Sequence, residues 1–342
     1  MSEVSSPTLA IVGATGAVGK ECLSILNEID WPADKLRLIA SPRSAGTSIR
    51  YADRDITIQP LHESAFSDVA YAIFAAGGQV SRDWAKRAVA AGTTVVDNSS
   101  AFRMDPDVPL IIPEVNGETL ELLHRPGIIA NPNCSTIIAL MAVTPIHRAA
   151  GVERMVVATY QAASGAGAAA MKELEDQAHD FAAGRPFRHE VFGRQYLFNL
   201  FSHNSAIGED GYNEEESKLV RETRKIWDDP SINITATCVR VPVLRAHAEA
   251  INLQLKRDLS ESAARSLLNL ASGVEILDDR ESNRFPEPIL ATGRDAVLVG
   301  RIRQDRSQAG QRGLDMFVVG DQLRKGAALN AVQIVQRLMS RG

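Results

Sequence analysis

The chain contains three cysteines, Cys22, Cys134 and Cys238, and its local sequence sets Cys134 apart. Pro132 and Asn133 precede Cys134, and an apolar run follows it. We expect Asn133 to cap a helix whose first turn holds Cys134, where free backbone N–H groups and the helix dipole stabilise a thiolate. A thiolate is a nucleophile, although a small buried cysteine would fit the same pattern. Cys22 lies inside an expected helix and Cys238 inside an apolar strand, which is typical of core residues.

A glycine-rich turn occupies residues 13–19, GATGAVG, between an apolar strand at 8–12 and a helix expected at 20–29. Its glycines permit positive φ and close approach of the backbone, and the helix N-terminus offers N–H groups to a pyrophosphate. In this place the pattern favours a dinucleotide site over a tight turn that serves structure alone. We expect its contacts to the dinucleotide to be Gly13, Thr15, Gly16, Ala17 and Val18.

The end of the second expected strand, 36–40, indicates which dinucleotide is bound. An NAD site places a carboxylate there to bind the ribose hydroxyls. This chain has Arg43 and Ser44 instead, with no acidic residue before Asp53. An arginine beside a serine suits a 2′-phosphate, so the sequence predicts NADP, although Arg43 could also be a solvated loop residue.

Short strands and helices alternate through the first third of the chain. Further strands are expected at 72–76 and 93–96, with a helix at 79–91 between them. This alternation is typical of a parallel, doubly wound, Rossmann-type sheet, so the fold class is α/β.

Longer strands follow residue 130, and they favour an α+β part with a mostly antiparallel sheet and helices on one face. The expected strands are 155–161, 235–241, 250–255, 297–303 and 314–319, and the expected helices are 133–147, 166–181, 214–226, 260–270 and 325–338. Residues 182–213 are weakly periodic and form either an irregular excursion or an oligomer contact.

The composition of the 342 residues excludes several classes of protein. Hydrophobic residues make up 45% and the net charge is −5, so the chain is globular and has no basic surplus for nucleic acid. Its longest apolar run, 137–143, is far shorter than the roughly 20 residues of a membrane span. The first residues lack the basic region of a signal peptide. Few cysteines, none with zinc-ligand spacing, indicate a cytoplasmic protein without a structural metal.

Six motifs in collinear order resemble those of aspartate-semialdehyde dehydrogenases. They are Gly13–Gly19, Ser99–Arg103, Asn131–Thr136, Tyr160–Gly165, Arg240–His247 and Gly320–Ala328. The resemblance implies NADPH-dependent reductive dephosphorylation of L-aspartyl 4-phosphate to L-aspartate 4-semialdehyde through a cysteine thioester. This is an early step toward lysine (by way of diaminopimelate), methionine, threonine and isoleucine.

The same resemblance implies an NADP-binding domain and a catalytic domain. Residues 1–130 would form the NADP-binding domain, completed by a C-terminal helix at 322–342. Residues 131–321 would form the catalytic and dimerisation domain of a homodimer or homotetramer. The partners would be the small-molecule substrate and inorganic phosphate, with no nucleic acid and no membrane.

Roles for individual side chains also follow from the resemblance. Cys134 corresponds to the nucleophile, His247 to the acid/base and Gln161 to the residue that orients the acyl group. The binding residues would be Arg240 for the substrate carboxylate, Glu215 for its ammonium, Arg103 and Lys218 for phosphate, and Ser164, Gly165 and Gln322 for the cofactor. Glu215 belongs to a run of three acids, 214–216, and such runs usually form a solvated face. The other histidines lack matching context and are expected to be ordinary surface or core residues: His62, His124, His147, His179, His189 and His203.

Four alternatives are weighed against this assignment. Reductases of N-acetyl-glutamyl phosphate have a glycine before the cysteine, where this chain has Asn133. A reductase of an acyl-CoA such as malonyl-CoA would not need phosphate-side cations such as Arg103 and Lys218. Glyceraldehyde-phosphate dehydrogenases follow their cysteine with Thr-Thr-Asn, unlike the Ser-Thr found here. A non-catalytic NADP-binding paralogue should have lost Cys134 or His247.

Overall fold

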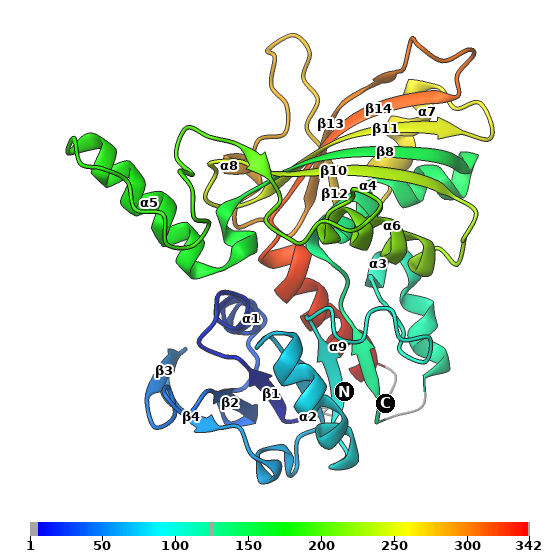
Figure 1. Ribbon diagram of the computed structural model, residues 1–342. Coiled ribbons are helices and arrows are strands. Elements are labelled where there is room, and N and C mark those ends of the chain that lie inside the picture. The colour runs from blue at the N-terminus through cyan, green and yellow to red at the C-terminus, as the bar shows by residue number, and fades with distance from the viewer. Residues whose placement is uncertain (1–5, 124–125, 341–342) are drawn as a thin grey trace. The chain divides into compact units, whose positions relative to one another are not determined.

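The computed structural model describes residues 6–123 and 126–340, and it divides the chain into two compact units. The first unit is Met1–Pro132 together with Ala327–Gly342, and the second is Asn133–Gly326. The division expected from the sequence, at 130/131 and 321/322, lies a few residues away from these breaks. His124 lies outside the described residues. The C-terminal helix α9 (Leu329–Met339), red in Figure 1, packs against α1 (Ala17–Glu28) of the first unit.

The first unit is built on a seven-stranded sheet in the order β3-β4-β2-β1-β5-β6-β7. Its strands are β1 (Leu9–Val12), β2 (Leu36–Ala40), β3 (Ser48–Tyr51), β4 (Arg54–Pro60), β5 (Tyr71–Phe74), β6 (Thr94–Asp97) and β7 (Ile128–Ala130). All neighbours are parallel except β3 and β4. All four residues of β1 are buried, as expected for a central strand covered on both faces. The predicted doubly wound sheet is therefore confirmed, although the hairpin β3–β4 was not expected.

The second unit contains another seven-stranded sheet, in the order β12-β13-β14-β11-β8-β10-β9. Its strands are β8 (Val152–Gln161), β9 (Phe201–Ser202), β10 (Asn233–Arg240), β11 (His247–Leu255), β12 (Val274–Ile276), β13 (Val297–Gln304) and β14 (Gly313–Gly320). Four neighbouring pairs are antiparallel. Two pairs, β8 with β10 and β12 with β13, are parallel. The mostly antiparallel sheet is confirmed.

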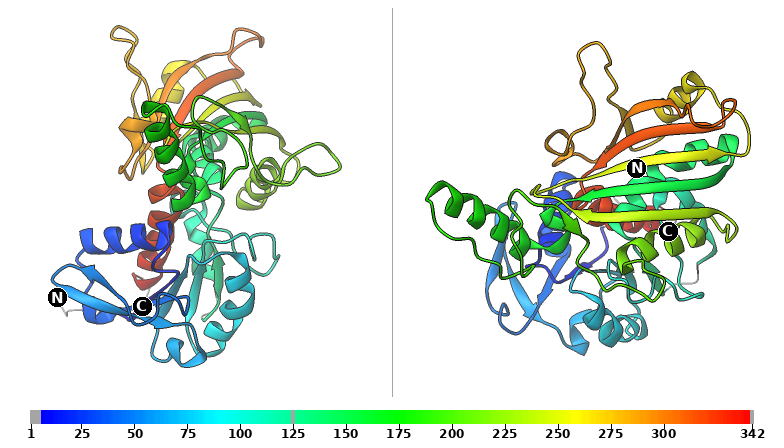
Figure 2. Two further views of the ribbon diagram at one scale, coloured as in Figure 1. Left: turned by 60° about the vertical axis from the view of Figure 1, so that its left-hand side comes forward. Right: turned by 45° about the horizontal axis from the view of Figure 1, so that its top comes forward.

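Three helices cover one face of this second sheet (Figure 2). They are α4 (Cys134–Ala150), α6 (Glu214–Ile226) and α7 (Glu261–Asn269). Helix α5 (Ala168–Ala182) extends beyond the end of the strands (Figure 1). The short helices are α3 (Pro113–Asn116) and α8 (Pro288–Ala291), and α2 (Gly78–Ala90) belongs to the first unit. Among the described residues, no helix is both long and apolar enough to cross a membrane.

Residues 182–213 are irregular apart from β9, and they pack around the buried ring of Tyr196. The Tyr196 hydroxyl donates to the Val241 carbonyl at 2.7 Å, which ties this segment to the chain just after β10. The segment is thus anchored beside the end of β10.

The strand register places two rows of polar side chains under the helices. Arg240 lies opposite Gln161, and Ala248 opposite Tyr160, so His247 comes next to Gln161. We call these three residues the terminal row, because all three stand at strand ends. Two residues further in, Cys238 lies opposite Thr159 and Thr159 opposite Glu249. This set is the inner row, and both rows are buried.

Candidate active site

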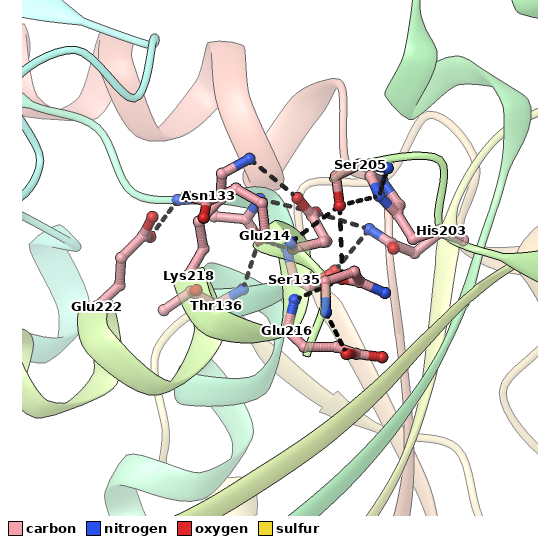
Figure 3. A network of polar contacts seen from close by, with 12 residues as sticks. Asn133, Ser135, Thr136, His203, Ser205, Glu214, Glu216, Lys218 and Glu222 are labelled. Carbon is pink, nitrogen blue, oxygen red and sulfur yellow. Dashed lines mark hydrogen bonds and ion pairs between the residues drawn. The ribbon is translucent and has the colours of Figure 1, made fainter. Parts of the chain in front are cut away.

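Cys134 is the first residue of helix α4, and Asn133 caps that helix. The Asn133 side-chain oxygen accepts from the backbone N–H groups of Ser135 at 3.0 Å and Thr136 at 3.3 Å (Figure 3). The Asn133 N–H donates in turn to Glu222 Oε2 at 2.6 Å. The predicted cap is confirmed, and it holds Cys134 where the helix dipole favours a thiolate.

The other two cysteines lie in different surroundings. Cys22 and Cys238 are buried, whereas Cys134 is partly exposed. Burial raises the pKa of Cys22 to about 12, and it raises the pKa of Cys238 as well. Neither thiol is suited to act as a nucleophile near neutral pH.

Gln161 joins the start of helix α4 to helix α6. Its side-chain Nε2 donates to Ser135 Oγ at 3.1 Å and to Glu215 Oε1 at 3.0 Å. Its Oε1 is buried and accepts no hydrogen bond from any described residue. The amide is therefore fixed in orientation and keeps one acceptor for a ligand.

Glu215 is buried, with 5% of its surface exposed, so the solvated face typical of an acidic run is wrong for this residue. Its carboxylate accepts from Asn133 Nδ2 at 2.8 Å, from Gln161 and from Lys218 Nζ at 3.2 Å. Burial opposes ionisation, but Lys218, the two amides and, when protonated, His203 hold the pKa of Glu215 below its ordinary value. Glu215 is thus an ionised carboxylate at neutral pH.

Three acceptors hold the buried guanidinium of Arg240. Nη1 donates to the Ala162 carbonyl at 3.0 Å, Nε to Asn204 Oδ1 at 3.3 Å, and Nη2 to His203 Nε2 at 2.8 Å. Arginine has five N–H donors, and the described residues accept from three of them. The remaining two are on the terminal nitrogens, where a carboxylate could accept both.

His203, expected to be an ordinary surface or core residue, is buried and contacts this arginine, a contact that was not predicted. His203 Nε2 lies 2.8 Å from Arg240 Nη2, while His203 Nδ1 accepts from the Ser205 backbone N–H at 3.2 Å and lies 3.0 Å from Ser205 Oγ (Figure 3). Because a donor faces each ring nitrogen and arginine only donates, these contacts fit a neutral imidazole and not a protonated one. Burial is the main cause that lowers the pKa of His203 to about 4; Glu215 opposes it, and Arg240 and Lys218 reinforce it.

His247 is fully buried, and its Nδ1 accepts the Ala162 backbone N–H at 3.0 Å. A neutral ring that accepts at Nδ1 carries its proton on Nε2. No described residue forms a hydrogen bond with Nε2. Burial is the main cause that lowers the pKa of His247 to about 3, and Arg240 adds to it. The ring therefore presents a neutral N–H donor.

Gly165 leaves space beside this donor. A Cβ at Gly165 would lie 2.9 Å from both Nε2 of His247 and Nη1 of Arg240. Any larger residue would fill the space that a ligand needs to reach both groups.

Ser164, Gln322 and Gly326 border the same region. Gln322 Nε2 donates to Ser164 Oγ, and Gln322 Oε1 accepts from the Ala246 N–H at 2.9 Å. A Cβ at Gly326 would lie 3.0 Å from Cys134 Cβ and 3.2 Å from Gln322 Cβ. Cys134 therefore lies close to the terminal row on two sides. Its neighbour Ser135 bonds to Gln161, and Gly326 lies against both Cys134 and Gln322, which bonds to the backbone next to His247.

The remaining predicted residues belong to the first unit. Arg103 is buried there and donates from Nε to the Asn131 carbonyl and from Nη2 to the Asn98 carbonyl, both at 2.9 Å. Arg43 is exposed and Ser44 partly exposed in the loop after β2. The structure thus gathers Cys134, Gln161, Ser164, Gly165, Glu215, Lys218, Arg240, His247 and Gln322 in the second unit, and leaves the other predicted residues in the first.

The glycine-rich turn fits a dinucleotide. Gly13 has φ +92°, and a Cβ there would lie 2.7 Å from the Ala75 carbonyl oxygen. Gly16 is the N-cap of α1, and no side chain caps that helix, so its first N–H groups are open to a phosphate. Thr15 and Gly16 are exposed, whereas Ala17 and Val18 are partly exposed. Among residues 6–123 and 126–340, no three His, Cys, Asp or Glu side chains are grouped to hold a metal ion.

Comparison with known proteins decides the family. Residues 8–123 match the semialdehyde dehydrogenase NAD binding domain, and residues 143–325 the semialdehyde dehydrogenase dimerisation domain. The aspartate-semialdehyde dehydrogenase of Synechocystis is 50% identical over 334 residues, which cover 98% of each chain. The chain belongs to the aspartate-semialdehyde dehydrogenase family. The family's enzyme from Aquifex aeolicus is 46% identical over 98% of each chain.

Members of the family also share this structure. The crystal structure of aspartate semialdehyde dehydrogenase II complexed with ASA from Vibrio cholerae matches with a TM-score of 0.94 and 42% identity, over 98% of each chain. The resemblance seen in the sequence is therefore confirmed over nearly the full length. The contacts of His203 and Asn204 with Arg240 had no signal in the sequence, because both residues lie in the weakly periodic segment.

Proposed function

We propose that the chain catalyses the NADPH-dependent reductive dephosphorylation of L-aspartyl 4-phosphate to L-aspartate 4-semialdehyde. The observation that carries the proposal is the grouping of a helix-capped Cys134 with a carboxylate-binding fork on Arg240 and a neutral N–H donor on His247. The names of the full-length relatives support this choice of substrate over other acyl phosphates. In metabolism the product would feed lysine (by way of diaminopimelate), methionine, threonine and isoleucine synthesis.

The first step is acyl transfer to Cys134. The thiolate attacks the acyl carbonyl, the C–O bond to phosphate breaks, and a thioester forms. Because the attacking sulfur is already a thiolate, His247 takes up no proton in this step, which suits a ring whose Nε2 already carries one. Helix α4 favours the thiolate before attack.

The second step reduces the thioester. When bound, NADPH supplies the hydride. The His247 Nε2–H donates to the carbonyl oxygen as it gains negative charge, and Gln161 holds the acyl group through its fixed amide. Collapse of the tetrahedral adduct breaks the C–S bond, releases the aldehyde and restores the Cys134 thiolate.

Charged side chains would select the substrate. The two unclaimed N–H groups of Arg240 suit the α-carboxylate, and Glu215 suits the ammonium group. Lys218 and Arg103 would attract the phosphate. Because Lys218 already pairs with Glu215, binding of ammonium and of phosphate would be coupled through this ion pair.

The cofactor would be NADP rather than NAD. Gly13, Thr15, Gly16, Ala17 and Val18 would hold the pyrophosphate at the start of α1, and Arg43 with Ser44 would bind the 2′-phosphate. Ser164, Gly165 and Gln322 would contact the nicotinamide side.

We further propose a cytoplasmic homodimer or homotetramer that assembles through residues 131–321, while 1–130 and 322–342 bind NADP. On the face of the second sheet opposite α4, the short helix α8 packs against β14, and the side chains of Tyr160, which is exposed, and Phe317, which is partly exposed, also lie on this face. Sedimentation would test the assembly, and a monomer would contradict it.

Phosphate dependence of the reverse reaction tests the proposed activity. NADPH absorbance should rise when the purified protein receives aspartate semialdehyde, NADP⁺ and phosphate. Coenzyme A should not replace phosphate, and N-acetyl-glutamate semialdehyde should not replace the substrate. Activity with coenzyme A alone would identify an acyl-CoA reductase instead.

A further inference from the structure

Glu249 stands in the inner row, directly below the terminal row. On β11 it lies two residues beyond His247 and therefore on the same face. Across the sheet it is opposite Thr159 of β8. Helix α4 packs over both strands, and its first turn carries Ser135.

The carboxyl of Glu249 has no surface exposed, and neither oxygen has a hydrogen-bond partner among the described residues. The facing Thr159 hydroxyl is also buried without such a partner. Two facing polar groups in this state are costly unless they bond to each other or to a buried water.

None of the groups that face Glu249 carries a positive charge that could stabilise an ionised carboxylate there. They are the Thr159 hydroxyl, the Cys238 thiol, the Ser135 hydroxyl and the negatively charged Glu215, while His247 on its own strand is neutral. Burial raises the pKa of Glu249 well above its ordinary value; the nearby Ser135 hydroxyl opposes this rise, and Glu215 adds to it. An isolated buried carboxylate would be far less stable than its neutral form.

Ser135 connects this carboxyl to the site. Its Oγ accepts from Gln161 Nε2 at 3.1 Å, and its backbone follows Cys134. We propose that Glu249 is a positioning residue: a neutral carboxylic acid that holds the Ser135 hydroxyl, directly or through one buried water, in the orientation that accepts the Gln161 amide.

This inference rests on the proposed function only for its kinetic readout. A neutral carboxyl would give the infrared C=O band of a carboxylic acid at neutral pH, a band that ionised carboxylates lack. The band should be present in the wild-type protein and absent from Glu249→Gln. Absence of the band in the wild type would overturn the proposal, whether or not the protein has the proposed activity.

Substitutions test the positioning role. Glu249→Gln keeps a neutral group of the same shape and should keep kcat within about twofold. Glu249→Leu should lower kcat by about tenfold or more, while KM for phosphate changes little, because the misplaced group is the acyl-orienting amide. Ile251→Ala, on the same face of β11, is the matched control, which should lose stability but keep kcat.

A double-mutant cycle with Ser135→Ala separates this role from general destabilisation. In the Ser135→Ala background, Glu249→Leu should cause no further loss of kcat. Additive losses, or a Glu249→Gln variant as impaired as Glu249→Leu, would overturn the proposal. If Glu249→Leu does not fold, the infrared band and the kcat of Glu249→Gln decide alone.

Discussion

Nη2 of Arg240 lies 2.8 Å from Nε2 of His203, and both groups are buried. Because the guanidinium only donates, this contact exists only while the imidazole is neutral. The orientation of the anion-binding fork therefore depends on the protonation state of a residue from the irregular segment 182–213.

His203→Ala should raise KM for aspartate semialdehyde about tenfold, because the fork loses one of three anchors. His203→Gln should restore most of the affinity, since a glutamine Oε1 can also accept from Nη2. Steady-state kinetics at saturating phosphate and NADP⁺ would measure both variants. An unchanged KM for His203→Ala would show that the other anchors suffice.

Stability should depend on pH through His203. The unfolded chain protonates this residue below about 6.5, whereas the folded protein keeps it neutral until about 4. The stabilisation is complete above pH 6.5 and falls by up to about 1.4 kcal/mol per pH unit as the pH drops toward 4.

Urea unfolding of wild type and His203→Gln between pH 7 and 5 would measure this effect. The low pKa of His247 acts in the same direction and the raised pKa of Glu249 in the opposite one, but both are common to the two proteins. The difference in unfolding free energy should shift in favour of the variant as the pH falls. A difference independent of pH would contradict the neutral state of His203.

Local patterns could be predicted from the sequence, and long-range contacts could not. The cap at Asn133 was predictable because the cap and the atoms it binds lie within three residues. The strand expected at 250–255 begins at His247 in the structure, so the common face of His247 and Glu249 was not predicted, and the partners of Glu249 depend on strand pairing. His203 lies 37 residues before Arg240, in the weakly periodic segment and separated from it by helix α6, and the exposed hairpin β3–β4 lacks the apolar runs that marked the other strands.

The cofactor preference is tested at Arg43. Arg43→Asp should weaken NADP binding by at least tenfold and affect NAD much less, because it places a carboxylate where the 2′-phosphate is expected. Fluorescence titration with both dinucleotides would give the two dissociation constants. Equal effects on both would remove Arg43 from the site.

Arg240 and Arg103 should respond differently to lysine. Arg240→Lys keeps the charge but loses the fork, so kcat and the semialdehyde KM should both worsen, by on the order of a hundredfold in kcat/KM. Arg103→Lys should mainly raise KM for phosphate. Varying phosphate and semialdehyde independently in one assay separates the effects. The opposite pattern would mean that the two assignments are exchanged or wrong.

The acyl-enzyme on Cys134 is the most direct test of the proposed mechanism. With semialdehyde and NADP⁺ but no phosphate, the thioester should accumulate and NADPH should appear in a burst of about one per site. After acid quenching and proteolysis, mass spectrometry should find an aspartyl group on the Cys134 peptide, and none in Cys134→Ser. A burst without this adduct, or an adduct on Cys22 or Cys238, would contradict the mechanism.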